Sequence, residues 1–490
     1  MDPLTIVALV FALGFALAFE CVNGFHDTAN AVATVIYTRT MPPAVAVVWS
    51  GLMNLLGVLT SNGAVAFGIV ALLPVELVIH VGSGAGAAMV FAILTSAIVW
   101  NLGTWYLGLP ASSSHTLIGS IIGVGLANSL LTPGHVFGDG VNWAKVQDTV
   151  TALLVSPVLG FVLAGGLFLL IKATIKYPAL YEAPPENQPP PWPVRIILFL
   201  TCTGVSFAHG SNDGQKGQGL IMLVLIGIIP AFYALNPDAS SAQIAALAAS
   251  SQASQAIILK HSGKLPNATQ GDDENVLSNF IKSGGTYTDA VWGSMADLNG
   301  KVAGDLQGVT SFAGLEGQEK KDIRTNIYLI GATIDKLAKN KKIADPAELK
   351  ELKAEQKGTD VFTKFIPVWV KIAVAFALGL GTMVGWKRIV VTVGEKIGKA
   401  HLTYGQGASA ETVTYLLIEA ADQFGLPVST THILSSGIAG TMAANRSGLQ
   451  GDTMRNILLA WVLTLPVCMF LGGGLFAAAV LALTKFLGIH

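Results

Sequence analysis

The sequence predicts an all-α, polytopic membrane protein with about 10–12 transmembrane segments. Of the 490 residues, 52% are hydrophobic and only 12% are charged, whereas soluble domains contain about 25% charged residues. Several apolar stretches reach the length of about 20 residues that a helix needs to cross a bilayer. Two Gly-Leu-Pro breakers lie among them, and broken backbone is tolerated at membrane depth only where it lines a protein cavity.

The first half of the chain is predicted to form a membrane repeat over residues 1–176. The apolar stretch 4–22 has no basic flank and no obvious cleavage site, so we interpret it as a retained membrane helix and not a signal peptide. Further apolar stretches, rich in Gly and Ala and suited to close helix contacts, complete the repeat. They cover 44–73, 86–107, 108–131 and 149–171.

The second half is predicted to begin after a proline-rich linker at 177–193, which leaves no room for a helix. Membrane segments at 194–235 and 363–490 form the second repeat, and a hydrophilic insert at 236–362 separates them. The insert holds about half of the chain's 29 lysine and arginine residues and no apolar run of 18 residues.

Basic residues give an expectation for topology, because short loops rich in Lys and Arg face the cytoplasm. Lys172, Lys176 and Arg195 flank predicted spans, and the insert is rich in lysine. We therefore expect these three residues and the insert to face the cytoplasm.

The composition excludes several classes of function. A net charge of −1 argues against nucleic acid as a partner. Cys21, Cys202 and Cys468 lie in apolar stretches, which favours buried thiols over a disulfide framework or a cysteine metal cluster. Without a Gly-x-x-x-x-Gly-Lys-Ser/Thr motif, ATP is not expected to drive the protein.

Two near-copies of one motif interrupt the apolar pattern, Gly-Leu-Pro-Ala-Ser-Ser-Ser-His at 108–115 and Gly-Leu-Pro-Val-Ser-Thr-Thr-His at 425–432. Each proline ends one helix and suits the first turn of the next, which Ser112 or Ser113 would cap in the first copy. Hydroxyls beside free N–H groups at a helix N-terminus favour a small oxyanion, although they could instead satisfy the backbone of kinked helices. The candidate anion ligands are the first hydroxyl triplet, Ser112, Ser113 and Ser114, and the second hydroxyl triplet, Ser429, Thr430 and Thr431.

Two polar segments also recur at membrane depth. The first polar segment, 20–30, reads Glu-Cys-Val-Asn-Gly-Phe-His-Asp-Thr-Ala-Asn, and the second polar segment, 209–216, reads His-Gly-Ser-Asn-Asp-Gly-Gln-Lys. Asp27 and Asp213 are carboxylates in apolar surroundings, where such groups are costly and mark ion or substrate sites. A structural cap or an ion pair is the alternative for each.

The motifs repeat in the same order along the chain. Asp27 and Ser112 are 85 residues apart, whereas Asp213 and Ser429 are 216 residues apart. The excess of 131 residues is close to the length of the insert, so two homologous halves with one insertion explain the spacing. Paired, Gly/Pro-interrupted segments in two halves indicate the central binding site of a transporter.

These residues resemble the inorganic phosphate transporter (PiT) family, and in particular its bacterial, proton-coupled branch. The resemblance rests on Asn-Gly-Phe-His-Asp-Thr-Ala-Asn-Ala at 23–31, Gly-Ser-Asn-Asp-Gly-Gln-Lys-Gly at 210–217 and both Gly-Leu-Pro motifs, and it covers both membrane halves. It implies two inverted repeats with broken helices and re-entrant hairpins. Phosphate would lie between the hairpin tips, and the polar segments would hold the coupling ion.

The chain departs twice from the Gly-Ala-Asn-Asp-Val-Ala-Asn-Ala motif that sodium-coupled members carry in both segments. His26 replaces the first Asn of the motif in the first segment, and Lys216 replaces the last Asn in the second. An ammonium group can fill a cation site as a fixed charge, which argues against sodium at the second segment. The candidate coupling-ion or proton residues are Asp27, Asn30, Asp213, Lys216, Glu20, His115 and His432. Metal ligands stay unassigned, with Asp27, Asp213 and His26 as candidates.

The leading hypothesis is secondary active import of inorganic phosphate by proton symport across the bacterial inner membrane. The resemblance implies that a divalent metal such as Mg²⁺ could travel with hydrogenphosphate, and a neutral complex lowers the cost of desolvation. Arsenate is the expected competing substrate, because it is nearly isosteric with phosphate. No resident cofactor is expected; membrane lipid is a partner, and a homodimer is left open.

Several rivals stay open. The runner-up is a sodium-coupled phosphate symporter, and a carrier of another oxyanion such as sulfate is a second. Ser112 and His115 with the buried aspartates leave an intramembrane hydrolase as a rival of another class. The duplicated elements offer no single nucleophile, so we expect a transporter and not an enzyme. A passive channel is the last alternative.

Overall fold

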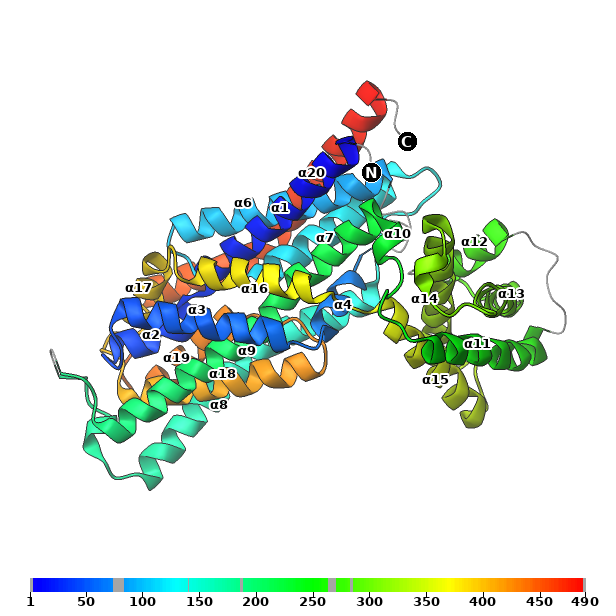
Figure 1. Cartoon of the computed structure of the whole chain (residues 1–490). Helices are drawn as coiled ribbons and strands as arrows, with labels where there is room; N and C mark the ends of the chain where they lie inside the picture. Colours follow the sequence, from blue (N-terminus) through cyan, green and yellow to red (C-terminus); the bar gives the residue numbers. More distant parts are fainter. Residues whose placement is uncertain are drawn as a thin grey trace.

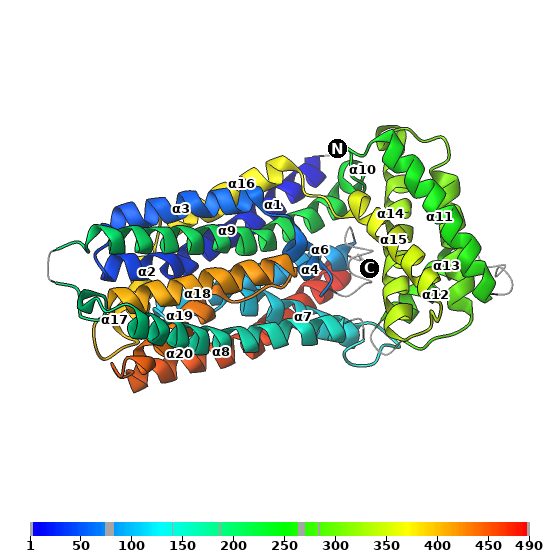
Figure 2. The same cartoon turned by 90° about the horizontal axis from the view of Figure 1, so that it is seen from below.

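The computed structural model describes residues 3–73, 83–139, 141–185, 188–262, 270–282 and 285–487. Within these residues the regular structure is helical, apart from one isolated β-bridge between Gly398 and Leu449. A long helical bundle carries a smaller helical domain at one end (Figure 1, Figure 2). The all-helical membrane class predicted from the sequence is confirmed.

The elements follow the two predicted halves. The first half contains α1 (Pro3–Asp27), α2 (Ala29–Tyr37), α3 (Pro43–Thr60), α4 (Ala64–Val70), α6 (Gly84–Tyr106), α7 (Ser113–Leu131) and α8 (Trp143–Thr174), followed by the 3-10 turn η1 (Pro178–Leu180). The second half contains α9 (Trp192–Ile228), α10 (Pro230–Tyr233), α16 (Val368–Thr382), α17 (Lys387–Glu395), α18 (Tyr404–Gln423), α19 (Thr430–Ala444), α20 (Gly451–Ala482) and the π-helical turn η3 (Leu483–Leu487). The domain at the end of the bundle contains α11 (Ser241–Ser262), α12 (Gln270–Ile281), α13 (Ala290–Asp305), η2 (Phe312–Gly314), α14 (Gly317–Lys339) and α15 (Pro346–Thr363).

Fewer segments than the predicted 10–12 are long and apolar enough to cross a membrane. Among the described residues there are 7, or up to 8 if the bent pair α15–α16 counts as one span. Two helices of the bundle account for part of the difference. Helix α19 has only 15 residues, and α18 carries three acidic residues, Glu411, Glu419 and Asp422.

The second polar segment lies inside a helix, because α9 runs without interruption from Trp192 to Ile228. Its glycines lie where neighbouring helices come closest. A Cβ added to Gly210 would lie 2.2 Å from the carbonyl oxygen of Asn54, and one added to Gly217 would lie 2.3 Å from Cγ of Glu20. The glycines therefore serve close packing, which is the main source of helix association in a membrane.

Both Gly-Leu-Pro motifs form the same backbone structure. Gly108 and Gly425 have φ of 68° and 63°, a left-handed conformation that glycine adopts without strain and that commonly ends helices. After each break, a serine caps the new helix. Ser112 Oγ accepts a hydrogen bond from the backbone N of His115 at 3.2 Å, and Ser429 Oγ accepts one from His432 at 3.1 Å.

The two halves exchange packing partners. Helix α7 packs against α20, and its counterpart α19 packs against α8; likewise α3 packs against α9, and α16 against α1. The closest approaches match as well. A Cβ on Gly123 of α7 would lie 2.1 Å from the carbonyl oxygen of Met469, and one on Gly440 of α19 would lie 2.1 Å from that of Phe161. This exchange agrees with two homologous halves, whose inverted orientation stays a prediction.

These contacts predict that Gly440→Ala destabilises the bundle. The added methyl group cannot fit 2.1 Å from the Phe161 oxygen, so α19 and α8 must separate, at a cost of about 1–3 kcal/mol. Gly166→Ala on α8 is the matched control, because nothing lies within 4 Å of its added Cβ. We expect a lower thermal unfolding midpoint in detergent for Gly440→Ala only; equal midpoints for the two variants would contradict the packing.

Residues 235–362 have a hydrophobic core of their own, which includes Leu247, Trp292 and Ile330. Polar contacts tie this domain to the bundle. The Arg324 guanidinium donates to the carbonyl oxygens of Ala234 at 2.9 Å and Thr363 at 3.1 Å. One half-buried cation therefore binds both chain segments that join the domain to the membrane helices.

The topology expectation is wrong in one respect. The domain of α11–α15 lies at one end of the bundle, whereas α8 ends and α9 begins at the opposite end (Figure 1, Figure 2). Lys172, Lys176 and Arg195 belong to that opposite end. They cannot face the same side as the insert, because α9 crosses the whole bundle between Arg195 and α10.

Glu355 predicts a pH dependence for the domain of α11–α15. Its carboxyl group is 3% exposed and accepts a hydrogen bond from Ser251 Oγ at 3.2 Å, and burial raises its pKa to about 7. The folded state therefore retains a proton that the unfolded chain loses at about pH 4.5. Stability is highest below that pH and falls by about 3 kcal/mol as pH rises to about 7.

The measurement is hydrogen exchange of α11 and α15 in the full-length protein, as protection factors at pH 5 and pH 8. We expect lower protection at pH 8 and no such difference in Glu355→Gln, which stays neutral. Identical pH dependence in the two proteins would contradict the prediction.

Candidate functional site

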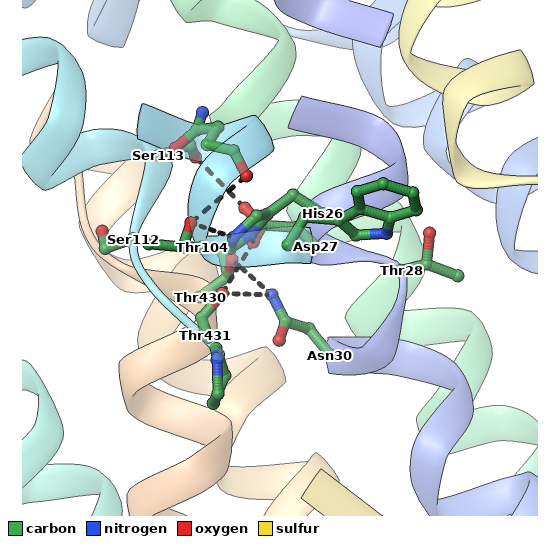
Figure 3. Close-up of polar contacts among 12 residues, drawn as sticks. His26, Asp27, Thr28, Asn30, Thr104, Ser112, Ser113, Thr430 and Thr431 are labelled. Carbon is green, nitrogen blue, oxygen red and sulfur yellow. Dashed lines mark hydrogen bonds and ion pairs between the residues drawn. The ribbon is translucent and has the colours of Figure 1, made fainter. Parts of the chain in front are cut away.

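The N-termini of α7 and α19 meet in the middle of the bundle, beside the junction of α1 and α2 (Figure 3). Ser114 Oγ donates to the carbonyl oxygen of Val428 at 2.7 Å, which fixes one helix start against the other. The rings of His115 and His432 lie 4.5 Å apart. Both hydroxyl triplets are buried, each residue at most 2% exposed. Two positive helix ends and six hydroxyls therefore converge on one place.

The six hydroxyls divide into two groups. Ser112 and Ser429 cap their own helices, and Ser114 bonds across to Val428, just before α19. Ser113, Thr430 and Thr431 instead contact the polar segments, as described next. Ser112, Ser114 and Ser429 therefore satisfy backbone groups, as the structural alternative predicts, whereas Ser113, Thr430 and Thr431 bond the polar side chains of the centre.

Asp27 is the meeting point of the first polar segment and both triplets. Thr431 Oγ1 donates to its Oδ1 at 2.7 Å, and Ser113 Oγ donates to its Oδ2 at 3.1 Å (Figure 3). His26 Nδ1 lies 3.1 Å from Oδ1, and His209 Nε2 lies 3.7 Å from Oδ2. The carboxylate is 2% exposed, and hydroxyls and imidazoles surround it.

Asn30 joins the second hydroxyl triplet to α2. Its Nδ2 donates to Thr430 Oγ1 at 2.9 Å and to Thr431 Oγ1 at 3.0 Å (Figure 3). Its Oδ1 makes no hydrogen bond to any residue that the structure describes. Asn30 therefore presents a buried acceptor one turn after Asp27.

Asp213 has a charged partner that Asp27 lacks. Lys216 Nζ lies 2.8 Å from Asp213 Oδ2, and the lysine side chain is fully buried. The same ammonium donates to Ser113 Oγ at 3.3 Å, and His209 Nε2 lies 3.3 Å from Asp213 Oδ2. The ammonium therefore does not snorkel to a membrane surface; it pairs with the aspartate one helical turn away.

The remaining sequence candidates lie around this centre. Glu20 is fully buried on α1, and its side chain contacts the backbone of α9 at Gly217. His26 Nε2 lies 3.1 Å from Thr104 Oγ1, and the ring of His432 stacks on Trp461 with centroids 4.0 Å apart. The structure thus brings every predicted site residue to one region of the bundle.

Two acidic residues of α18 lie apart from this centre. Asp422 accepts hydrogen bonds from Ser211 Oγ at 2.8 Å and Gln215 Nε2 at 2.6 Å, which pins α18 to α9. Glu411 accepts hydrogen bonds from the hydroxyls of Thr34 and Thr201 and joins α18 to α2 and α9. Both carboxylates act as bonds between helices.

The cluster with metal-ligand geometry differs from the sequence candidates in one residue. Ligand atoms of Asp27, His209 and Asp213 all lie within 4.8 Å of one another. His26 approaches Asp27 from the other side and bonds Thr104, so it does not complete this cluster. The sequence feature that could have identified His209 as a site residue is its position four residues before Asp213 on one helix. No pattern pointed to Asn54, whose Oδ1 lies 2.9 Å from His209 Nδ1.

The comparisons with known proteins identify the family. A model described as "Phosphate transporter family" matches residues 23–472. The chain belongs to the phosphate transporter family. The resemblance seen in the sequence motifs is thereby confirmed, and members of this family are transporters and not enzymes. The apolar helices make this member a multi-pass membrane protein.

Relatives cover almost the whole chain. It is 43% identical over 495 residues to the "Low-affinity inorganic phosphate transporter PitA" of Escherichia coli (strain K12), with 97% of each chain covered. It is 27% identical over 473 residues to the "Probable low-affinity inorganic phosphate transporter" of Bacillus subtilis (strain 168), with 96% of this chain and 97% of that one covered. A solved structure titled "The sodium-dependent phosphate transporter" matches with TM-score 0.50 and 19% identity over 98% of this chain and 100% of that one. That likeness shows the fold.

Proposed function

We propose that the protein imports inorganic phosphate by proton symport across the bacterial inner membrane. The relatives that cover nearly the whole chain are named low-affinity inorganic phosphate transporters. The observation that carries the coupling mode is the contact of 2.8 Å between the Lys216 ammonium and Asp213. The Lys216 ammonium, a permanent cation, thereby pairs with Asp213, which is the counterpart of Asp27 in the second half.

The phosphate site is proposed between the two hydroxyl triplets. A helix N-terminus binds oxyanions through free N–H groups and its dipole, and here the starts of α7 and α19 converge. Ser113, Thr430 and Thr431 add hydroxyl donors, and the Lys216 ammonium bonds Ser113 at 3.3 Å. The duplicated geometry suits a tetrahedral oxyanion held from both halves of the protein, and arsenate would fit the same donors.

Carboxylates beside an anion site require a counter-charge during transport. Asp27 and Asp213 both lie within hydrogen-bonding reach of Ser113, so a phosphate dianion there faces two carboxylates and one ammonium. A proton on the Asp27 side of the site offsets the repulsion. A divalent cation does the same as part of the cargo, and Asp27, His209 and Asp213 are the residues that would contact it.

Sodium coupling is the second candidate, and Asn30 is the observation that favours it. Asp27 and Asn30 provide a carboxylate and a free amide oxygen at the first polar segment, which are ligands that a hard cation accepts. In the second segment, Asp213 Oδ1 and Asn212 Oδ1 also lack a hydrogen bond to any described residue, but the Lys216 ammonium lies 2.8 Å from Asp213 Oδ2 and would repel a second cation. The fixed charge of Lys216 therefore favours the first segment as the position for sodium.

We also propose an orientation in the membrane and an oligomeric state. The domain of α11–α15 is placed in the cytoplasm, which leaves the opposite end of the bundle, with Arg195, facing outward. A homodimer in the membrane is proposed, in contact with lipid along the exposed apolar helices.

Lys216 provides the test of coupling. Lys216→Asn removes the counter-charge and leaves Asp213 buried without it, which costs about 3–5 kcal/mol when a buried pair is broken. We expect phosphate uptake to be abolished or to become sodium-sensitive, and Lys216→Arg to be impaired because a guanidinium lacks the compact shape of an ammonium. The measurement is labelled-phosphate uptake into proteoliposomes at a fixed pH gradient, with sodium replaced by choline.

Wild-type uptake should continue in choline and collapse when the pH gradient is dissipated. The double variant Asp213→Asn with Lys216→Met removes both charges, so no unpaired charge is left buried. It therefore distinguishes a variant that fails to fold from one that folds but does not transport. Wild-type uptake that stops in choline and follows the sodium gradient would replace this proposal with the sodium-coupled one.

Ser113 provides the test of the anion site. Ser113→Ala removes the hydroxyl that lies between Asp27 and Lys216, and a hydrogen bond to a charged group contributes roughly 1.5–3 kcal/mol. Phosphate affinity should therefore fall about tenfold or more. Ser120→Ala is the control, because Ser120 lies two turns beyond Ser113 on α7 and bonds Ser96 of α6. Equal phosphate affinity in both variants would remove the hydroxyls from the site.

A further inference from the structure

Helix α17 lies at the end of the bundle opposite the domain of α11–α15 (Figure 1). A basic and aromatic pocket lies between α17 and the end of α6. Its cavity volume is about 700 Å³. Three basic side chains, Lys387, Arg388 and Lys396, line it, together with three aromatic ones, Trp105, Tyr106 and Trp386. The pocket takes no part in the central site described above.

Side-chain bonds build this pocket by joining α17 to the end of α6. Trp105 Nε1 donates to the carbonyl oxygen of Gly385 at 2.7 Å. The Arg388 guanidinium donates to the carbonyl oxygen of Tyr106 at 2.9 Å and lies 5.4 Å from the centre of the Trp105 ring. Buried Ile389 faces the bundle, so the basic side chains of α17 are left on its outer face.

The charge of the pocket is unbalanced. No Asp or Glu lines it, and no ion pair joins Lys387, Arg388 or Lys396 to a carboxylate among the residues that the structure describes. Lys387 and Lys396 are exposed. Three cations around one cavity create a local field that favours an anion.

The apolar flank of the pocket indicates which anion. Tyr106 is 65% exposed and Leu107 is 69% exposed, at the end of the bundle where the aromatic belt of a membrane protein lies. Lysine and arginine side chains bind the phosphate of a headgroup through charge-assisted hydrogen bonds on either face of a membrane. A free phosphate ion would leave most of the 700 Å³ and the exposed apolar rim without a contact.

We propose that this pocket binds the phosphate of an anionic phospholipid headgroup, with an acyl chain along Tyr106 and Leu107. The bound headgroup would bridge α6 and α17. Because Thr392 Oγ1 donates to the carbonyl oxygen of Gly108 at 2.8 Å, that bridge also holds the loop that leads to the first hydroxyl triplet. The inference is independent of which ion drives transport.

The test uses full-length protein in detergent with phosphatidylglycerol or phosphatidylcholine, and native mass spectrometry counts the lipid retained. The wild type should retain phosphatidylglycerol in preference. Each lysine near an anionic headgroup contributes a factor of roughly five in affinity, so Lys387→Ala with Lys396→Ala should lose roughly 25-fold for phosphatidylglycerol only. Lys399→Ala is the control, because Lys399 is an exposed lysine just beyond α17 that does not line the pocket.

Two results would overturn the proposal. Unchanged phosphatidylglycerol retention in the double variant would show that the lysines do not hold a headgroup. Displacement of phosphatidylglycerol by millimolar inorganic phosphate, but not by chloride at equal ionic strength, would assign the pocket to the free ion. Both lysines are exposed, so the double variant should keep the wild-type thermal midpoint; Lys387→Glu alone gives a second measure of the same loss.

Discussion

The buried pair of Lys216 and Asp213 is the interaction on which the centre of this protein depends. An ammonium and a carboxylate at membrane depth are tolerated only if each is paired and hydrogen-bonded. The pair satisfies this condition with a contact of 2.8 Å and a bond to Ser113. Both charges come from α9, so the helix must continue unbroken through the second polar segment to keep them one turn apart. The start of α7 must then lie against this turn to supply the hydroxyl.

Close backbone packing makes that arrangement feasible. Helices in a bilayer gain little from hydrophobic burial and associate through contacts that small residues allow. Gly210 and Gly217 let α9 approach α3 and α1 until an added Cβ would lie within 2.3 Å of a neighbouring atom. The side chains between them, including Lys216, are thereby enclosed. The glycines of the motif shape the site indirectly, by removing the space in which water would solvate the charges.

The sequence predicted the parts of the site whose structure depends on residues that are neighbours in the chain. A proline after a left-handed glycine predicts a helix start, and the caps at Ser112 and Ser429 follow from it. Repeated spacing predicts that Asp27 and Asp213 occupy equivalent places. The uninterrupted course of α9 could not be read from its glycines, because the same residues break a helix in water and tighten one in a bilayer. The contact between His209 and Asn54 could not be predicted from the sequence, because it depends on the packing of helices that lie 155 residues apart in the chain.

Equivalent positions in the two halves carry unequal charge, and this asymmetry has a physical consequence. Asp27 is surrounded by Ser113, Thr431 and two imidazoles, which are neutral donors or groups that can gain and lose a proton. Asp213 faces a fixed ammonium. In the proposed mechanism the Lys216 ammonium is a cation fixed in the chain, so the Asp27 half is the one that would exchange a cation or proton with the solution. The change from Asn30 in the first half to Lys216 in the second therefore alters the charge at one side of the proposed site, while both hydroxyl triplets and both helix ends keep the same structure.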